Sequence, residues 1–322
     1  MQYVHLGRAG VLVSRLGLGT MNLGMVTDAA ESERILDGAL DLGINLVDTA
    51  DVYGVVDGDG ITESLIGRWI AAEPSRRDRI VLATKLGVRT AEGPNDAGLS
   101  ARHIRRACEA SLRRLRTDHL DLYQMHHVDR ETSWEEIWQA MEQLIREGKV
   151  LYVGSSNFAG WHVARAQSIA ETRGCFGLAS EQSVYNLANR TVELELIPAC
   201  SALGIGVLAY APLAGGVLGG RAAGVGVRRA AEEQRTLVAR LRQRADRYDK
   251  FCTELGASPA RVALAWLLRQ PGVTAPIVGP RTFEQLVDAH AALAVALDDS
   301  ARRELDEIWP GPGGPAPESY AW

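Results

Sequence analysis

Short apolar segments alternate with amphipathic segments along most of the chain. Residues 32–42 show the amphipathic kind: their apolar side chains fall on one stripe of a helix, and Gly43 follows as a C-terminal cap. Residues 79–84 show the apolar kind, which is typical of a buried strand. The same patterns predict further strands at 16–19, 45–47, 120–126, 150–154, 178–183, 205–210 and 273–278, and further helices at 62–72, 100–115, 134–147 and 283–292.

This alternation predicts an α/β fold, a (β/α)8 TIM barrel of parallel strands. Residues 1–15 are expected to form an N-terminal β-hairpin, residues 16–293 the barrel, and residues 294–322 a C-terminal helix and tail, all in a single domain. The alternative is an open doubly wound sheet. That fold needs a glycine-rich turn after its first strand, and residues 16–20 match such a turn poorly.

Three segments interrupt the alternation. Residues 57–60 are rich in glycine and aspartate and predict a loop. Residues 215–235 are rich in glycine and then basic, which predicts a mobile cover over the mouth of the barrel. The proline- and glycine-rich tail 310–322 either packs near that mouth or is frayed.

Composition narrows the class of protein. The chain has 322 residues, 46% of them hydrophobic, and a net charge of −5, which gives no sign of a nucleic-acid-binding surface. The N-terminus lacks the pattern of a signal peptide, and no apolar run is long enough to span a membrane, so we expect a cytoplasmic protein. The cysteines are scattered, which predicts reduced thiols and neither a disulfide framework nor a zinc site: Cys108, Cys175, Cys200 and Cys252.

Reactive side chains stand at the ends of three successive predicted strands. Asp48 and Tyr53 follow the second strand, Lys85 ends the third, and His126 ends the fourth. In an α/β barrel the C-terminal ends of the strands converge on one site, so these four side chains are expected to lie together. Each also has a structural reading, such as a strand terminus or a capping carboxylate, and His127 competes with His126 for its role.

Together the four residues suit the reduction of a carbonyl group. Hydride delivered to the carbonyl carbon leaves an alkoxide, and Tyr53 would protonate it as general acid. A free phenol titrates near 10, and a neighbouring ammonium stabilises the phenolate, so Lys85 would assist Tyr53 while Asp48 holds Lys85 in place. His126 would orient and polarise the carbonyl oxygen.

The second half of the chain contains groups suited to a nicotinamide cofactor. Ser156, Asn157 and Gln182 offer hydroxyl and amide groups for the carboxamide, and Tyr210 offers a ring for stacking. The run 211–216, which includes Ala211 and Pro212, can bring backbone N–H groups to a pyrophosphate. Residues 278–282 then open a helix, so a phosphate beside Gly279, Arg281 and the capping Thr282 is physically favourable and favours NADPH over NADH.

Residues 48–54 (DTADVYG), 154–158 (GSSNF) and 279–282 (GPRT) with Gln285 resemble motifs of the aldo-keto reductase family. The resemblance extends from the N-terminal hairpin to about residue 293, and within the family it is to the bacterial branch related to potassium-channel β subunits and to actinomycete-type reductases, some of which act in nucleotide-deoxysugar pathways. It implies a barrel that binds NADPH/NADP+ in an extended form without a Rossmann domain. By position it also implies contact of the cofactor with Gly19, Thr20, Met21, Asp48, Leu213, Gly215, Arg221, Gln285 and Asp288.

The chain departs from the family pattern at Ala211, where a serine is common, at Ala289, where an asparagine contacts adenine, and at Pro280. The resulting hypothesis is an NADP-dependent carbonyl reductase that acts on a small polar aldehyde or ketone, such as a keto-sugar or a nucleotide-linked deoxysugar. Two alternatives stay open. One is an NADPH-binding regulatory subunit that senses redox state, and the other is a Schiff-base aldolase that uses Lys85.

Overall fold

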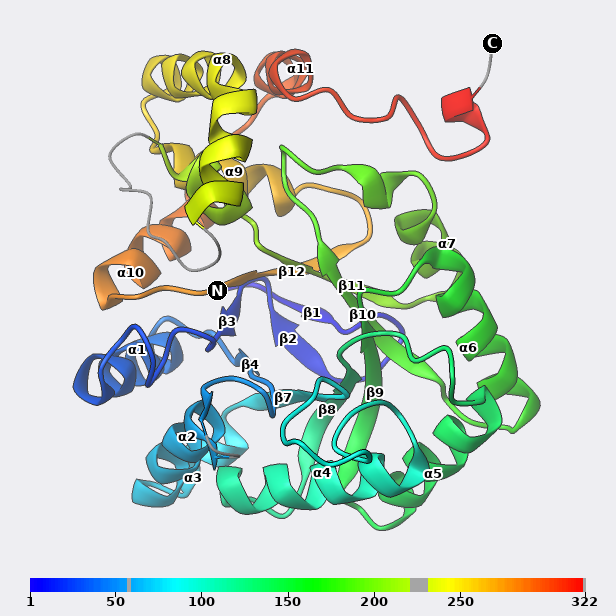
Figure 1. Cartoon of the computed structure of the whole chain (residues 1–322). Coiled ribbons are helices and arrows are strands. Elements are labelled where there is room, and N and C mark those ends of the chain that lie inside the picture. The colour runs from blue at the N-terminus through cyan, green and yellow to red at the C-terminus, as the bar shows by residue number, and fades with distance from the viewer. Residues whose placement is uncertain (57–58, 221–230, 321–322) are drawn as a thin grey trace.

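A computed structural model describes residues 1–56, 59–220 and 231–320 of the chain. In this part, the strands are β1 (Tyr3–His5), β2 (Leu12–Ser14), β3 (Gly17–Gly19), β4 (Leu46–Asp48), β5 (Val55–Val56), β6 (Asp59–Gly60), β7 (Val81–Leu86), β8 (Leu120–Met125), β9 (Val150–Ser156), β10 (Leu178–Val184), β11 (Gly206–Tyr210) and β12 (Val273–Val278). The helices are α1 (Ala29–Asp41), α2 (Ile61–Ala72), α3 (Ser75–Asp78), α4 (Ala101–Leu115), α5 (Trp134–Arg146), α6 (Gly160–Thr172), α7 (Leu196–Leu203), α8 (Ala231–Leu255), α9 (Pro259–Leu267), α10 (Phe283–Ala291) and α11 (Asp299–Ile308) (Figure 1).

Eight strands form a closed parallel barrel in the order β10-β11-β12-β3-β4-β7-β8-β9. The seam between the two ends of the chain pairs Ile277 with Gly17 and Val278 with Leu18. A Cβ atom on Gly17 would lie 2.5 Å from the terminal methyl group of Ile277, so a larger residue at this position would require the Ile277 side chain to shift. The predicted TIM barrel is confirmed, and the alternative of an open sheet is wrong.

Apolar side chains pack on both sides of the barrel wall. Those that point inward, such as Leu46, Leu122 and Leu208, form one cluster with Leu6 and Val13 of the β1–β2 hairpin. The predicted hairpin at residues 1–15 is confirmed, and it closes the N-terminal end of the barrel. A larger cluster lies between the strands and the surrounding helices.

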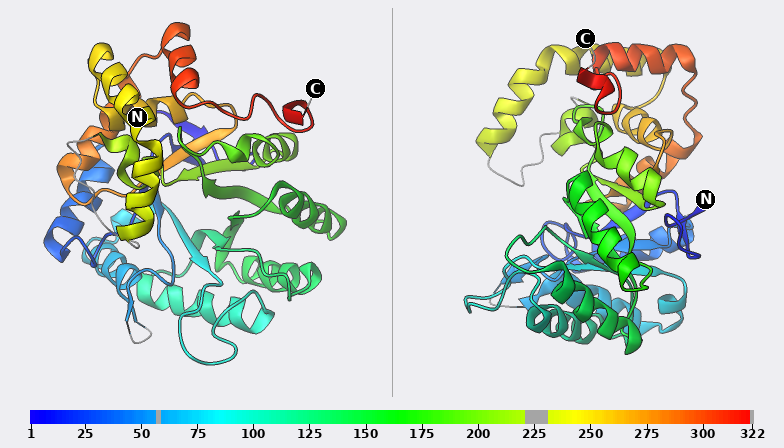
Figure 2. Two further views of the ribbon diagram at one scale, coloured as in Figure 1. Left: turned by 45° about the horizontal axis from the view of Figure 1, so that its top comes forward. Right: turned by 90° about the vertical axis from the view of Figure 1, so that its right-hand side faces the viewer.

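The helices begin and end where local sequence favours it. Ser100 and Ser133 accept hydrogen bonds from the first turns of α4 and α5, and Gly43 and Gly148 follow α1 and α5 with positive φ angles. The helices surround the barrel, and α8 and α11 lie side by side at its outer edge (Figures 1 and 2). This arrangement leaves the C-terminal ends of the strands as the place where their connecting loops meet.

Several boundaries differ from the pattern-based predictions. β7 begins at Val81 and ends at Leu86, so Lys85 is the penultimate residue of the strand rather than its last. The predicted loop at 57–60 instead contributes β6 to a small ladder with β5, because Val55 pairs with Gly60 and Val56 with Asp59. The segment 215–235 is not one irregular stretch: a 3-10 turn covers Ala214–Gly219 and α8 begins at Ala231, whereas 221–230, with Arg221, lie outside the described residues.

The tail follows the first of its two predicted alternatives. It runs from α11 back over the segment that connects β10 to α7 (Figure 2). The Ala316 N–H donates a hydrogen bond of 2.8 Å to the Leu194 carbonyl there. The tail is therefore bound to a loop at the mouth of the barrel.

Candidate active site

Adjacent strands bring together the four residues expected to carry the chemistry. Asp48 is the last residue of β4, Lys85 lies near the end of β7, and His126 directly follows β8. β7 pairs with both of the other strands, so these three positions share one end of the barrel. Tyr53 reaches the same place from the turn after β4.

Asp48 and Lys85 form a buried ion pair. The Lys85 Nζ lies 2.6 Å from Asp48 Oδ2, and the two side chains are 1% and 3% exposed. Nζ also donates to the Thr49 carbonyl at 2.9 Å and to the Tyr53 hydroxyl oxygen at 3.3 Å. Burial alone lowers the pKa of Lys85, but the charge of Asp48 and the contacts with Asp48 and Tyr53 outweigh it and raise the pKa.

Two glutamines complete the environment of Asp48. Gln124 Nε2 and Gln182 Nε2 each donate to Asp48 Oδ1 at 2.9 Å. Sequence reasoning missed Gln124, although a single polar residue inside the otherwise apolar end of β8 could have drawn attention to it. Gln182 was expected to bind a carboxamide. Its nitrogen is engaged with Asp48 and with Gln124 Oε1, and its oxygen accepts no hydrogen bond within the described part of the chain.

Tyr53 and His126 face each other across the site. Their ring centroids are 6.1 Å apart and their planes meet at 80°, an edge-to-face arrangement. The rings of His126 and His127 are stacked at 5.3 Å. His126 N–H donates to the Leu86 carbonyl at 2.9 Å, which holds the histidine next to the end of β7. Of the two histidines, His126 is the one whose ring meets Tyr53.

The turn after β9 is tied to β11. Asn157 has a φ of 61°, and its side chain donates to the His126 carbonyl at 3.1 Å and to Ser156 Oγ at 3.0 Å. The Tyr210 hydroxyl donates to Asn157 Oδ1 at 2.8 Å. The polar atoms of Asn157 are therefore used within the protein, which leaves Ser156 and the oxygen of Gln182 as the better carboxamide partners of the predicted set.

A buried carboxyl group supports this turn from outside the barrel. Glu181 accepts hydrogen bonds from the Phe158 N–H at 3.0 Å and from Ser183 Oγ at 2.7 Å, and from Ser155 Oγ. Burial raises the pKa of Glu181 to about 7. Sequence reasoning did not single out this residue.

A second buried carboxyl group lies in the turn that carries Tyr53. Neither oxygen of Asp51 has a hydrogen-bond partner of ordinary geometry within the described residues. Burial, and then the nearby Glu63 carboxylate, raise the pKa of Asp51 well above its usual range. Glu63 itself is paired with Arg114 at 2.7 Å.

The segment after β12 lies beside the loop after β3. Asn22 Nδ2 donates to the Gly279 carbonyl at 2.8 Å, and Thr27 Oγ1 donates to the Arg281 carbonyl at 3.1 Å. Thr20 Oγ1 donates to the Asp48 carbonyl at 2.9 Å, so this loop also contacts the end of β4. The predicted cofactor residues Gly19, Thr20, Met21, Gly279 and Arg281 thus occupy neighbouring segments.

The structure changes the argument for phosphate at the start of α10. Thr282 caps the helix by accepting from the Gln285 N–H, as predicted, and Gln285 Oε1 accepts from the Arg281 N–H at 2.8 Å. However, the Phe283 N–H already donates to the Glu31 carboxylate at 2.6 Å. A phosphate at this helix end would meet that carboxylate, so the predicted preference for NADPH would have to depend on the Arg281 side chain and not on the helix end.

Asp288 and the segment 211–216 were also predicted to contact the cofactor, and the structure shows what surrounds each of them. Asp288 accepts a hydrogen bond of 2.7 Å from Arg261 Nε, which pairs it with α9. The segment after β11 has positive φ angles at Ala211, Ala214, Gly215 and Gly216, and Pro212 and Leu213 lie between them. This backbone is held in an uncommon conformation, which is typical of functional loops.

Two features of the described residues bear on other classes of function. None of the described helices is long and apolar enough to cross a membrane. No group of three or more histidine, cysteine, aspartate or glutamate side chains suited to a metal ion occurs in the described ranges. The cytoplasmic location remains a prediction.

Comparison with known proteins identifies a family. A model of the aldo/keto reductase family matches residues 15–310. A protein of Bacillus subtilis named as an uncharacterized oxidoreductase, YrpG, is 52% identical over the whole length of both chains. A probable voltage-gated potassium channel subunit beta of Oryza sativa subsp. japonica is 35% identical, with 92% of each chain covered, and the versiconal hemiacetal acetate reductase of Aspergillus parasiticus is 33% identical, with 95% of this chain and 96% of that protein covered.

Proposed function

Since the chain belongs to the aldo/keto reductase family, we propose that this oxidoreductase reduces an aldehyde or ketone to an alcohol, with NADPH as hydride donor. The observation that supports this most directly is the buried contact between Asp48, Lys85 and Tyr53 at one end of the barrel. A phenol held against a buried ammonium is suited to give up a proton. The versiconal hemiacetal acetate reductase among the relatives is named for a reduction, which agrees with this class of reaction.

The residues present fit a nicotinamide cofactor. The loop at 211–216 leaves open space around Gly216, where a Cβ atom would meet nothing within 4 Å. Ser156, the Gln182 oxygen and the Tyr210 ring lie around the end of the barrel next to the catalytic groups, and Arg281 lies one segment away on the far side of β11. We propose that Ser156 and the Gln182 oxygen bind the carboxamide and that the Tyr210 ring stacks on the nicotinamide face. Arg281 would bind the 2′-phosphate. Bound NADPH supplies the hydride.

The side chains of the site transfer one proton to the substrate oxygen. When the substrate carbon gains the hydride, its oxygen becomes an alkoxide and takes the proton from the Tyr53 hydroxyl. Lys85 stabilises the phenolate that remains, and Asp48 with its two glutamine donors keeps Lys85 charged and in position. Solvent returns a proton to Tyr53. His126, whose ring faces Tyr53, orients the carbonyl oxygen.

The contacts of Lys85 argue against a Schiff-base aldolase. A Schiff base requires a neutral and accessible amine, whereas Lys85 is buried, hydrogen-bonded to three oxygens and raised in pKa. A regulatory, NADPH-binding subunit is the second candidate, because one relative is named as a channel subunit. Intact cofactor binding without any turnover would favour it.

The test is a fluorescence titration of the purified protein with NADPH and with NADH. We expect tighter binding of NADPH, and we expect Arg281→Ala to remove that preference while Arg102→Ala, a change at an exposed arginine of α4, leaves it unchanged. Tyr53→Phe should keep cofactor binding and lower kcat/KM for carbonyl substrates by about 10²–10⁴-fold, the usual contribution of a general acid. If the protein binds neither nucleotide, the proposal is wrong.

A further inference from the structure

Glu181 lies directly behind the groups proposed to bind the nicotinamide carboxamide. It precedes Gln182 in β10, and successive side chains of a strand point to opposite faces of the sheet. Gln182 points into the barrel, where it contacts Asp48, so Glu181 points outward and is buried between the barrel and the helices. In the ladder between β9 and β10, Glu181 is paired with Ser155 and Gln182 with Ser156.

The Glu181 carboxylate holds the turn after β9 on both sides of Ser156 and Asn157. One of its oxygens accepts a hydrogen bond from Ser155 Oγ, and the other accepts from the Phe158 N–H at 3.0 Å. Ser155 and Phe158 are the residues that flank the pair in the chain. The backbone between them is unusual, because Asn157 has a left-handed φ of 61°. One carboxylate therefore fixes both ends of the turn that presents Ser156.

All three of these donors to Glu181 are neutral, namely the hydroxyls of Ser155 and Ser183 and the N–H of Phe158. In the described part of the chain, no lysine or arginine contacts this carboxylate. Burial of a carboxylate without a cation lowers the stability of the fold. However, hydrogen bonds to an ionised acceptor are about twice as strong as neutral ones. The charge therefore strengthens the turn at the expense of overall stability.

Two other titratable groups lie near Glu181, on the neighbouring helices. Cys200 of α7 is buried, and burial and then Glu181 raise the pKa of its thiol, which therefore stays neutral at physiological pH. His162 of α6 is also buried, and its pKa is lowered by burial and then by Arg130, against the opposing effect of Glu195. Burial raises the pKa of Glu181 to about 7, so Glu181 itself changes charge between pH 6 and pH 8.

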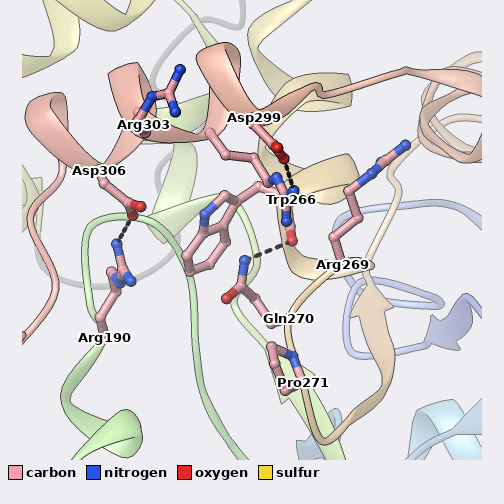
Figure 3. A pocket seen from close by; sticks show the side chains of 9 residues that line it. Arg190, Trp266, Arg269, Gln270, Pro271, Asp299, Arg303 and Asp306 are labelled. Carbon is pink, nitrogen blue, oxygen red and sulfur yellow. Dashed lines mark hydrogen bonds and ion pairs between the residues drawn. The ribbon is translucent and has the colours of Figure 1, made fainter. Parts of the chain in front are cut away.

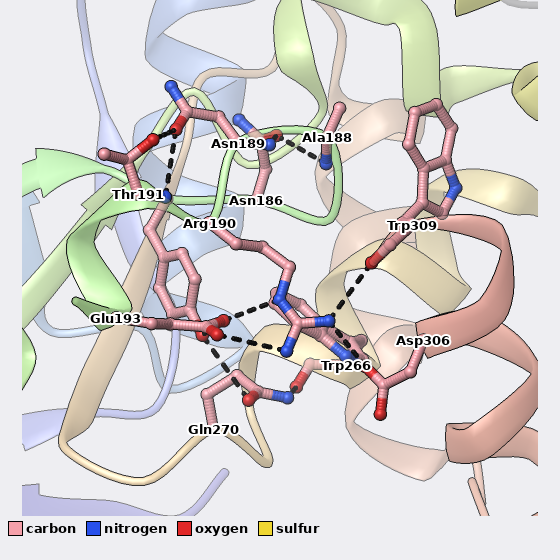
Figure 4. Close-up of polar contacts among 11 residues, drawn as sticks. Asn186, Ala188, Asn189, Arg190, Thr191, Glu193, Trp266, Gln270, Asp306 and Trp309 are labelled. Atoms are coloured by element: carbon pink, nitrogen blue, oxygen red, sulfur yellow. Dashed lines mark hydrogen bonds and ion pairs between the residues drawn. The ribbon is translucent and has the colours of Figure 1, made fainter. Parts of the chain in front are cut away.

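Arg190 anchors the segment after β10 but does not contact the turn after β9 (Figure 4). Its guanidinium donates to both oxygens of Glu193, at 2.7 and 3.1 Å, and to the Trp309 carbonyl at 3.1 Å. Figure 3 shows it reaching Asp306 at the edge of a pocket of about 420 Å³ that residues of α9 and α11 line. A change at Arg190 therefore loosens the surroundings of β10 without removing a contact of the turn.

We propose that Glu181 is a positioning residue for the cofactor: its ionised carboxylate keeps the turn 156–158 in the shape in which Ser156 and the Gln182 oxygen bind the nicotinamide carboxamide. The inference rests on the proposed function, because it requires NADPH to bind at this end of the barrel. It assigns to Glu181 an effect on the nicotinamide half of the cofactor alone. Protonation of Glu181, or its replacement by glutamine, should therefore weaken binding of that half.

The first experiment separates the two halves of the cofactor. Adenosine 2′,5′-bisphosphate has the adenine and the 2′-phosphate of NADPH but lacks the nicotinamide. Its Kd and that of NADPH are measured by isothermal titration calorimetry at pH 8, where Glu181 is ionised. We expect Glu181→Gln to raise the Kd of NADPH about fivefold, the difference between a charge-assisted and a neutral hydrogen bond to the turn, and to leave that of the bisphosphate within about twofold.

The control is Arg190→Met, which should leave both values within about twofold of the wild type, because Arg190 does not contact the turn. If Arg190→Met weakens NADPH binding as much as Glu181→Gln does, the effect is a general loosening of β10 and the inference is wrong. It is also wrong if Glu181→Gln weakens the two ligands equally or weakens neither.

The second experiment changes the charge without a substitution. The wild type gains a proton at Glu181 as pH falls through about 7, whereas Glu181→Gln cannot. The ratio of their Kd values for NADPH should therefore fall from about 5 at pH 8 to about 1.5 at pH 6, and the ratio cancels the titration of NADPH itself. A ratio that does not change with pH would overturn the inference.

The outcomes for the two proposals are distinct. If the wild type binds NADPH and the ratio stays near 1 at both pH values, the role of Glu181 is wrong and the proposed function stands. If the ratio changes as expected but no carbonyl compound is reduced, the proposed function fails and the role of Glu181 stands. If the wild type binds no NADPH, both are wrong.

Discussion

The buried pair of Asp48 and Lys85 allows a quantitative test, because both charges are removed from solvent. Asp48→Asn leaves the Lys85 ammonium without a counterion, and its new amide would also place a donor against a donor. Lys85→Met leaves the Asp48 carboxylate with only its two glutamine donors, each at 2.9 Å. Breaking a buried pair by removing one partner costs about 3–5 kcal/mol, so each single variant should lose about that much free energy of unfolding.

The double variant Asp48→Asn/Lys85→Met should be more stable than the sum of the two losses predicts. Once both charges are gone, no uncompensated charge is buried, so the cycle should give a coupling of at least about 2 kcal/mol. All three variants should be inactive. Tyr53 loses its ammonium neighbour in Lys85→Met and in the double variant, and in Asp48→Asn the ammonium is no longer held in position. The double variant should therefore regain free energy of unfolding without regaining activity.

The assay is urea unfolding at pH 7, followed by tryptophan fluorescence and by circular dichroism, whose coincidence establishes the two-state transition that the cycle requires. The matched control is the exposed pair of Lys250 and Glu254, whose side chains are 78% and 62% exposed. There the same kind of cycle should give less than about 0.5 kcal/mol. Additive losses at Asp48 and Lys85, within about 0.5 kcal/mol, would refute the view that burial of an unpaired charge dominates this site.

Two further predictions concern other buried charges. The pKa of Glu181 is raised from 4.5 to about 7 in the folded protein, so the folded state binds more protons between these values and stability should fall as pH rises through them. Relative to Glu181→Gln, the wild type should lose about 3 kcal/mol over this range, and parallel pH profiles of the two proteins would contradict the assignment. Arg190→Met leaves Glu193 and Asp306 without their shared cation and should lower the free energy of unfolding by about 2–3 kcal/mol in the same urea assay, whereas Arg102→Ala on exposed α4 should change it by less than about 0.5 kcal/mol. An Arg190 effect no larger than that of the control would mean that the contacts of Arg190 with Asp306 and the Trp309 carbonyl do not hold the tail.

The alternating pattern of the chain was sufficient for the fold class. Each strand of the barrel is a short apolar run, and several of these runs are followed by a segment predicted to form a helix, so a parallel sheet is the arrangement that buries both. The pattern also placed Asp48, Lys85 and His126 at strand ends, and parallel strands put such ends on one side of the sheet. That Lys85 contacts both Asp48 and Tyr53 was therefore open to prediction.

Contacts that depend on barrel closure and on loop geometry were not open to prediction. Gln124 and Gln182 are 58 residues apart. Both reach Asp48 only because closure of the barrel places their side chains inside it at the same height. Glu31 occupies the start of α10 from a helix 252 residues away, which no local capping pattern reveals. The bond from Tyr210 to Asn157 likewise depends on which way two loops turn.

The sequence by itself determined the eight barrel strands, their order, the helices α1, α2, α4, α5 and α10, and the kinds of side chain at the strand ends, because hydrophobic period and capping are local properties of the chain. It did not predict α6, α7, α8 or α9. The tertiary structure alone decided which polar groups are already satisfied by the protein and which carboxylates neutralise Arg190. These depend on distances between segments far apart in the chain, and the free energy of a buried polar group depends on those distances rather than on its neighbours in sequence.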